Sequence, residues 1–572
     1  MATSSLIPLY TTTHSRTRAQ ESSAAIQRLY IAMRHLFIRG SYKPLGVSGE
    51  AMIEALMTLR PEIYGSIADP ERVELDGLLY IFQRLPEGIE ECRYINLISR
   101  EGYENAHFTP IIPPKRKRNC YRIDPEQMFI ELTRGRSDIY DVLTHLTFLF
   151  IESEKIRRNS ESNRGNLTRE WKMLEESVKM ESEGQEIDLQ VAYTYLSSIL
   201  GRPYAEIAIA AEQFEKAPKV NSLFRITYWM GKLSRDEKRE SKDRVISFSS
   251  ALREKVGHHL HGEIWANQIK KYLLDNHLFH RPIHVISSNL HSVMNTFFAP
   301  ATLKRIRKTE DMSALALDLS KEEHGDYRSK VQDFAIKNGM HPIYDDSGTN
   351  IEVQVYDLVQ IDPTILPPEV HWNAKYVEES QPLLLVMDYA FGEQAYESMD
   401  ELLKPFDYQG NTYCLDIRSI SVMGKAGILE GKKGDIMIPT AHVFEGTADN
   451  YPLENELKKE DFEGHGLDVY QGPMITVLGT SLQNKDILKF FLESSWKAVG
   501  LEMEGAHYQK AIQAASKIRN NIRPDIVLRY AYYASDNPLI TGHTLASGSL
   551  GEEGVKPTYL ITWKILDKIL NS

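Results

Sequence analysis

From Arg281 to the end of the chain, short apolar runs alternate with helical patterns. Apolar runs of this length between turn residues predict buried strands, and helices between them predict an α/β domain with a largely parallel or mixed sheet. We therefore expect one such domain over residues 281–572. The strand-like runs cover residues 283–288, 351–358, 383–387, 419–423, 436–439, 473–478, 499–503 and 526–534.

Residues 21–280 predict a mainly helical region instead. Ile26, Leu29 and Met33 recur at helical spacing, and Gly40 then provides a stop signal. No motif in this region indicates a task. Residues 1–20 are rich in Ser, Thr and Arg, which predicts a disordered tail, with a transit peptide as the alternative.

Two polar segments of the helical region are candidate binding sites. Residues 109–121 contain three prolines and the basic run Lys115–Arg118. Such a loop can bind phosphate or an acidic partner, and we favour a solvated linker. Residues 257–263 read G-H-H-L-H-G-E and match no metal motif. We interpret them as helix-surface or interface histidines and expect no metal ion and no cofactor.

Composition narrows the class of protein. The chain has 572 residues with a net charge of −12, which argues against a nucleic-acid partner. No apolar run approaches the roughly 20 residues of a membrane helix, so no membrane partner is expected. Cys92, Cys120 and Cys414 lie far apart, which indicates a reducing compartment without a disulfide framework. We expect a cytoplasmic protein.

Four strand ends of the α/β half carry polar or glycine residues. Because parallel strands bring their carboxyl ends to one edge of a sheet, these ends are expected to meet. Glycine after a strand lets backbone N–H groups approach a phosphate or ribose closely. In a strand, Glu502 and Glu504 share one face, and a solvated acidic strand end is the alternative. The four ends are Asp388–Gly392, Met423–Gly427, Glu502–Glu504 and Ala534–Pro538.

Several of these segments carry a family resemblance. The order G-K-A-G, then L-E-M-E-G-A, then S-D-N-P-L resembles the nucleoside phosphorylase and nucleosidase superfamily, most closely the S-D-K-P-L of AMP nucleosidases. The resemblance covers roughly residues 281–572. It implies a nucleoside-phosphorylase-like α/β fold, with a central mixed sheet flanked by helices after the helical region. The matching segments are 285–298, 388–392, 424–427, 434–438, 501–506 and 535–539.

The resemblance implies hydrolysis of the N-glycosidic bond of a purine nucleotide or nucleoside in a homo-oligomer. The resemblance also implies that Asp536 protonates or hydrogen-bonds purine N7, that Ser535 positions Asp536, and that Glu504 binds the ribose hydroxyls. Phosphate is a further candidate ligand. Phosphorolysis, or nucleotide sensing without catalysis, are the alternatives. The remaining candidate substrate-binding residues are Met503, Glu502, Gly392, Gly424, Lys425, Ala426, Gly427, Asn289, Leu482 and Asn484.

The chemistry of the reaction agrees with two carboxyl groups in different protonation states. Cleavage of a purine N-glycosidic bond creates oxocarbenium character on ribose and electron density on the base. A protonated Asp536 helps the base to leave, and an ionised Glu504 stabilises the sugar. Asn537 stands where the motif has lysine, and Asn289 and His291 stand near where related hydrolases carry a glutamate. The group that activates water therefore stays open.

Overall fold

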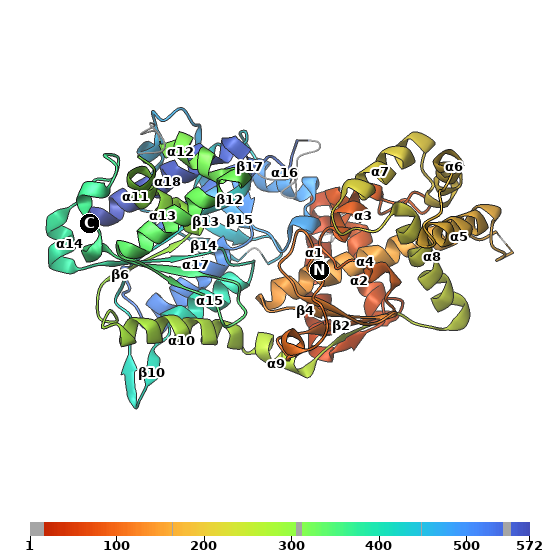
Figure 1. The fold of residues 1–572 in the computed structure, drawn as a ribbon, viewed down its shortest axis with the longest axis horizontal. Coiled ribbons are helices and arrows are strands. Elements are labelled where there is room, and N and C mark those ends of the chain that lie inside the picture. Colours follow the sequence, from red (N-terminus) through yellow and green to blue (C-terminus); the bar gives the residue numbers. More distant parts are fainter. Residues whose placement is uncertain (1–16, 163, 305–311, 448, 541–550, 572) are drawn as a thin grey trace, which may run out of the picture.

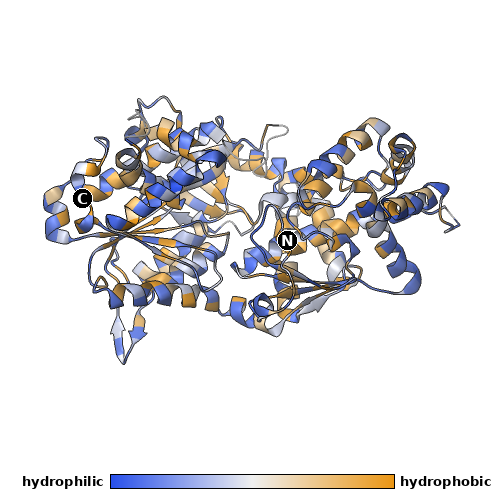
Figure 2. Cartoon of the chain, viewed as in Figure 1, coloured by the Kyte–Doolittle hydropathy of each residue, from blue (hydrophilic) through white to orange (hydrophobic). Residues whose placement is uncertain are grey.

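The computed structural model describes residues 17–162, 164–304, 312–447, 449–540 and 551–571. It has two lobes, an N-terminal one and a C-terminal one, with α16 (Lys485–Glu493) of the C-terminal half at their junction (Figure 1). Apolar residues gather on the strands and on the inward helix faces (Figure 2). No helix in the described ranges combines the length and the apolar character that crossing a membrane requires.

The N-terminal lobe is largely helical, as expected, but it also contains a five-stranded mixed sheet. The strands run from two to five residues, too short to give a clear periodic signal in the sequence. In sheet order they are β1 (Ser41–Tyr42), β5 (Val245–Phe248), β2 (Tyr94–Ile98), β4 (Gln127–Glu131) and β3 (Cys120–Asp124). The helices are α1 (Arg18–Arg39), α2 (Val47–Leu59), α3 (Leu75–Phe82), α4 (Gly135–Asn159), α5 (Arg169–Ser182), α6 (Leu189–Leu200), α7 (Tyr204–Lys216), α8 (Leu223–Glu240) and α9 (Ser250–Gly257).

The start of α1 changes the interpretation of the N-terminal tail. Thr17 caps this helix, and its side chain and that of Gln20 form a reciprocal capping box. Residues 17–20, expected in the disordered tail, therefore belong to an ordered helix start. Residues 1–16 of that predicted tail lie outside the described residues.

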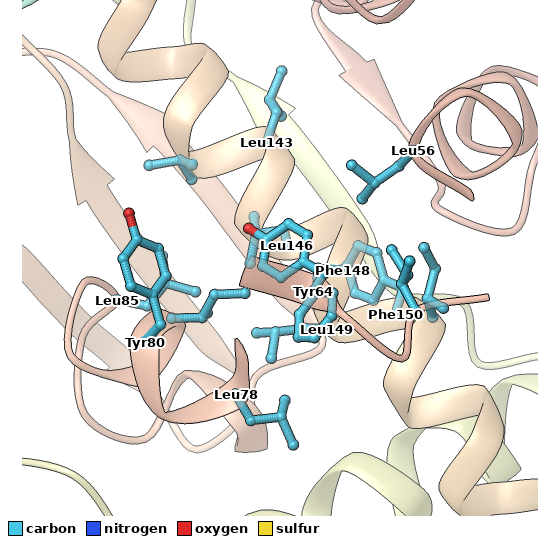
Figure 3. Close-up of a cluster of buried hydrophobic side chains, with 14 of the residues drawn as sticks. Leu56, Tyr64, Leu78, Tyr80, Leu85, Leu143, Leu146, Phe148, Leu149 and Phe150 are labelled. Carbon is cyan, nitrogen blue, oxygen red and sulfur yellow. The ribbon is translucent and has the colours of Figure 1, made fainter. Parts of the chain in front are cut away.

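Long α4 forms the centre of the N-terminal core. Its apolar side chains pack with Tyr64, Leu78 and Tyr80 in one cluster (Figure 3). The same core includes residues of the C-terminal half, among them Leu482, Ile487 and Leu501. Because apolar side chains of both halves are buried together, the two halves share one packed junction.

The C-terminal half is built on a ten-stranded mixed sheet, which confirms the expected α/β class. Its main path runs β14-β13-β15-β16-β12-β6-β9-β8-β7. Strand β17 pairs with both β12 and β13, so β12, β17, β13, β15 and β16 close into a ring. The strands are β6 (Ile283–Ser287), β7 (Met340–Ile343), β8 (Val353–Asp357), β9 (Leu383–Met387), β12 (Ile417–Ile428), β13 (Ile436–Phe444), β14 (Asn450–Pro452), β15 (Val469–Thr476), β16 (Gly500–Glu502) and β17 (Val527–Asp536).

Helices cover both faces of this sheet. Trp265, Ile269 and Leu273 of α10 (Leu260–Asp275) pack into the C-terminal core although the helix follows the N-terminal lobe in sequence. A separate hairpin is formed by β10 (Phe406–Tyr408) and β11 (Asn411–Tyr413). The other helices are α11 (Leu290–Leu303), α12 (Met312–Ser320), α13 (Gly325–Lys337), α14 (Ala374–Ser380), α15 (Gln394–Leu403), α17 (Gly505–Gln513) and α18 (Val555–Leu570).

Candidate active site

The carboxyl ends of β6 and β9 lie beside the middle of β12, and several candidate residues meet there. Ser287 pairs with Met387 on one side and with Val422 on the other, so Asn289, Tyr389 and Gly424 follow at nearly the same level. The Tyr389 ring lies against Gly424, where an added Cβ would meet it at 3.5 Å. A pocket of about 390 Å³ opens here, lined by Arg100, Lys117, Asn289, Leu290, His291, Asp345, Asn350, Glu352, Asp388 and Tyr389.

Glu504 is held at this edge by the backbone of a neighbouring turn. The Gly392 N–H donates to Glu504 Oε1 at 2.9 Å. Burial raises the pKa of Glu504 to about 8, the charge of Glu502 adds to this rise, and Lys425 opposes it. The Lys425 side chain is exposed. Its cation therefore faces solvent near Glu504, whose carboxyl group binds a proton more readily than an ordinary glutamate.

Glu502 does not share a strand face with Glu504, contrary to what its spacing predicts. Strand β16 ends at Glu502, and the helix α17 begins at Gly505, so the two glutamates do not alternate along one strand. Glu502 Oε2 accepts from the backbone N–H groups of Glu504 and Gly505, and the Thr476 hydroxyl donates to its Oε1. Its carboxylate therefore caps the start of α17 rather than facing a substrate. Burial raises its pKa to about 7.

Asp536 is the last residue of β17 and is only 2% exposed. The Ser535 hydroxyl donates to Asp536 Oδ1 and also contacts the Ala426 carbonyl oxygen at 3.1 Å. The following Asn537 donates to the Gly431 carbonyl at 3.2 Å and accepts from the Leu539 N–H at 3.0 Å. Asn537 thus anchors the turn after the strand.

The segment Gly424–Gly427 lies between the two candidate carboxyl groups. Gly427 pairs with Asp536 of β17 on one side and with Leu501 of β16 on the other. Because β16 runs antiparallel to β12, the chain from Leu501 to Glu504 heads back toward Lys425 and Gly424. Three residue steps of strand span on the order of 10 Å. The structure thus brings Asp536 and Glu504 to opposite ends of one short segment.

Leu482 and Asn484 lie at the junction of the halves. Asn484 Nδ2 donates to the Leu59 carbonyl at 2.8 Å, and its Oδ1 accepts from backbone N–H groups at the start of α16. Leu482 is 3% exposed within the shared apolar core. The resemblance implies that Leu482 and Asn484 approach the base. In the structure, both side chains instead contact the N-terminal half or their own helix.

The N-terminal half supplies residues to this edge that the sequence did not indicate. The Glu393 N–H donates to Ser137 Oγ at 2.8 Å, and Arg136 forms an ion pair with Glu393 at 2.7 Å. The interpretation of Lys115–Arg118 as a solvated linker fits Lys115 and Lys117, which are exposed, but is wrong for Arg118. Arg118 is 2% exposed and binds Asp138 and Asp141, which lie about 20 residues later on α4. This partnership is nonlocal, so the basic run alone did not reveal it.

The histidine-rich run lies at an interface between elements. His261 Nε2 is 2.8 Å from the Ser99 hydroxyl, and its Nδ1 is 2.7 Å from the Ser347 carbonyl oxygen. Among the residues that the structure describes, no three His, Cys, Asp or Glu side chains gather in a metal-binding arrangement.

Gly392 is the position where backbone shape matters most to the site. Its φ is +55°, and an added Cβ would lie 2.5 Å from Ser137 Oγ. We expect Gly392→Ala to lower the free energy of unfolding by about 1–3 kcal/mol and to displace the donor to Glu504. Urea denaturation measures the first effect.

Gly410→Ala is the matched control for this prediction. Gly410 has φ +81° with no atom within 4 Å of an added Cβ, so the variant carries backbone strain without a clash. Gly392→Ala should be the more destabilising of the two, and Ser137→Gly in the same chain should restore part of the difference. If Gly392→Ala and Gly410→Ala lower the free energy of unfolding equally, the contact with Ser137 does not contribute to the effect.

The raised pKa of Glu504 predicts a pH-dependent stability. The pKa is about 8 in the folded protein against an ordinary 4.5, so the folded state binds more protons between these values. Unfolding free energy therefore falls as pH rises through that window. Glu504→Gln removes this loss. The unfolding free energy of the variant relative to that of the wild type should therefore rise from about pH 5 to about pH 8 and stay constant above. A difference that stays constant across urea titrations at these pH values would contradict the assignment.

Comparison with known proteins places the chain in a family. A family model described as "Family of unknown function (DUF6909)" matches residues 50–335 and 312–571. The chain belongs to this family. A search of curated proteins finds no match.

Some solved structures match this chain over about half its length. A futalosine hydrolase mutant of Helicobacter pylori strain 26695 is 11% identical with a TM-score of 0.30, covering 50% of this chain and 99% of its own. A 5′-methylthioadenosine/S-adenosyl homocysteine nucleosidase of Campylobacter jejuni is 11% identical with a TM-score of 0.29, at the same coverage. A uridine phosphorylase from Schistosoma mansoni is 14% identical with a TM-score of 0.29, covering 51% and 87%. Such low identities leave the role of each site residue to its own geometry.

Proposed function

We propose that this protein hydrolyses the N-glycosidic bond of a purine nucleotide or nucleoside, as an AMP nucleosidase does. The observation that carries the proposal is the placement of Asp536 and Glu504 at opposite ends of Gly424–Gly427. One carboxyl group is held by a serine hydroxyl and the other by a backbone N–H. A purine nucleoside needs two such groups, one at the base and one at the sugar.

In this proposal Asp536 donates a proton to N7 of the leaving base. Ser535 orients the carboxyl group through its hydroxyl. Glu504 accepts from the ribose hydroxyls and, once ionised, stabilises the positive charge that develops on the sugar. Met503, whose methyl group would lie 3.8 Å from a Cβ at Gly392, supplies an apolar wall beside the ribose.

The charges of the neighbouring pocket favour water over phosphate as the nucleophile. Asp345, Glu352 and Asp388 all line it, together with Asn289 and His291. Arg100 and Lys117 line it too, so the lining holds one more negative than positive charge. This excess disfavours a phosphate dianion, whereas a water molecule is readily bound and polarised there. This charge balance supports hydrolysis over phosphorolysis.

Product analysis tests the function. The full-length protein is incubated with AMP or adenosine, with and without inorganic phosphate, and the base and sugar products are quantified by chromatography. We expect adenine with ribose 5-phosphate from AMP, formed at the same rate without added phosphate. Formation of a ribose 1-phosphate that requires phosphate would instead identify a phosphorylase. Nucleotide-dependent thermal stabilisation without base release would identify a sensor.

A further inference from the structure

Four arginines of the N-terminal half gather where it faces the turn after β9. We call Arg84, Arg116, Arg118 and Arg134 the arginine cluster. Two carboxylates of α4 contact it. Asp141 lies 2.6 Å from Arg118 and 3.1 Å from Arg116, and Asp138 lies 2.7 Å from Arg118 and 3.2 Å from Arg134.

The cluster carries more positive than negative charge. Guanidinium groups stay protonated in proteins, so four cations face the two carboxylates Asp138 and Asp141. Neighbouring His145 adds no charge at neutral pH, because burial lowers its pKa to about 3. Two positive charges are therefore left over. Buried charge is costly unless it is paired, and Arg84 is only 7% exposed.

Two guanidinium N–H groups of the cluster also have no acceptor among the described residues. Within the described ranges, Arg84 Nε and Arg134 Nε are buried without a hydrogen-bond partner. Arg84 also stacks on Tyr80, with its guanidinium carbon 3.4 Å from the ring centroid. This stacking fixes the plane of the Arg84 guanidinium group. Oriented donors with surplus charge match the chemistry of a phosphate group, which accepts several charge-assisted hydrogen bonds.

The cluster lies next to the proposed sugar site. The Phe391 ring is 5.4 Å from the guanidinium carbon of Arg116 and 4.9 Å from that of Arg134. Phe391 precedes Gly392, whose N–H donates to Glu504. One residue step, about 3.8 Å between Cα atoms, therefore separates the ring that the arginines contact from the donor that holds the ribose-binding carboxyl group.

We propose that the arginine cluster binds a phosphate monoester, which for the proposed enzyme is the 5′-phosphate of a purine nucleotide. The assignment to the 5′-phosphate rests on the proposed function, since it needs the ribose to lie on Glu504. The N-terminal half then completes the substrate site and selects nucleotides over nucleosides. Free inorganic phosphate offers the same chemistry and is the other source.

Substitution of Arg134 separates recognition of phosphate from catalysis. We expect Arg134→Met to lower kcat/KM for AMP by about 10- to 100-fold, since a charge-assisted contact is lost, and to change kcat/KM for adenosine less than about threefold. Arg84→Met should act in the same direction. Arg244→Met is the matched control, because Arg244 is also buried, pairs with Glu237 and lies 4.4 Å from a phenylalanine ring. It should affect both substrates alike.

A thermal-shift measurement on the full-length chain gives a readout without turnover. AMP should stabilise the wild type more than adenosine does, and this excess should vanish in Arg134→Met and Arg84→Met. If inorganic phosphate alone stabilises the wild type but not these variants, and AMP has no excess, the bound group is free phosphate. Arg134→Gln, which keeps a polar side chain but removes the charge, replaces Arg134→Met if the latter fails to fold.

The outcomes distinguish the two proposals. An equal loss for AMP and adenosine in Arg134→Met would overturn the phosphate assignment and leave the function standing. Absence of base release from both substrates would end the proposed function. In that case the cluster is judged by thermal shift, and stabilisation by AMP or phosphate that persists in both arginine variants would overturn it.

Discussion

Asp536→Asn is expected to lower kcat for base release from AMP by about 10²- to 10⁴-fold, the usual contribution of a general acid. The amide keeps the shape of the carboxyl group and its contact with the Ser535 hydroxyl, so the fold should survive. The departing purine loses its proton donor and carries away unneutralised electron density. Stopped assays of adenine release measure the effect, with thermal denaturation to verify folding.

A change of leaving group tests the role of Asp536 as an acid. A p-nitrophenyl riboside expels a stable phenolate that needs no proton, so its cleavage should fall much less in Asp536→Asn than that of AMP. If both substrates lose the same factor, Asp536 acts through binding or structure instead of proton donation.

Glu504→Gln is expected to reduce kcat for AMP by about 10²- to 10³-fold, as loss of one preorganised electrostatic contact in an active site does. The neutral amide still reaches the Gly392 N–H through its oxygen, so the turn after β9 should keep its geometry. Burial raises the pKa of Glu504 to about 8, so the carboxyl group expected to be ionised binds a proton at neutral pH in the free protein. What the variant loses is the negative charge that Glu504 supplies to the developing oxocarbenium ion once it is ionised, and the strong acceptor for the ribose hydroxyls.

A deoxyribose substrate supplies the control for Glu504. The 2′-deoxy analogue of AMP lacks one hydroxyl that Glu504 binds in this proposal, so the ratio of AMP to deoxy-AMP turnover should shrink in Glu504→Gln. Glu502→Gln should instead lower stability, because Glu502 caps α17. An unchanged substrate ratio in Glu504→Gln would remove Glu504 from the sugar site.

The sequence predicted eight of the ten strands of the C-terminal sheet, most of them apolar runs, and missed the short strands β7 and β14, which contain proline and polar residues. The expectation that the ends carrying Asp536 and Glu504 meet because their strands are parallel does not describe this sheet, since β16 runs antiparallel to β12 and β17 runs parallel to it. The small N-terminal sheet was missed because strands such as Ser41–Tyr42 have two residues and pair with partners some 200 positions away. Pairing at that separation leaves no local pattern.

Several candidate residues make contacts that their place in the sequence did not indicate. The face of Glu502 depended on where its strand ends, and β16 ends at Glu502 itself, just before the helix α17 begins. Asn484 is an N-cap, a role that residue type alone does not distinguish from a ligand. The arginine cluster depends on acids from α4 and on contact between the two halves, both of which are visible only in the folded chain.

Release of purine base from AMP in phosphate-free buffer, followed for the wild type and Asp536→Asn side by side, tests the central claim most directly. We predict adenine and ribose 5-phosphate in equal amounts from the full-length wild type, and release from the folded variant slower by about 10²-fold or more. Equal rates in the two proteins, or no base from AMP or adenosine with a folded wild type, would contradict it.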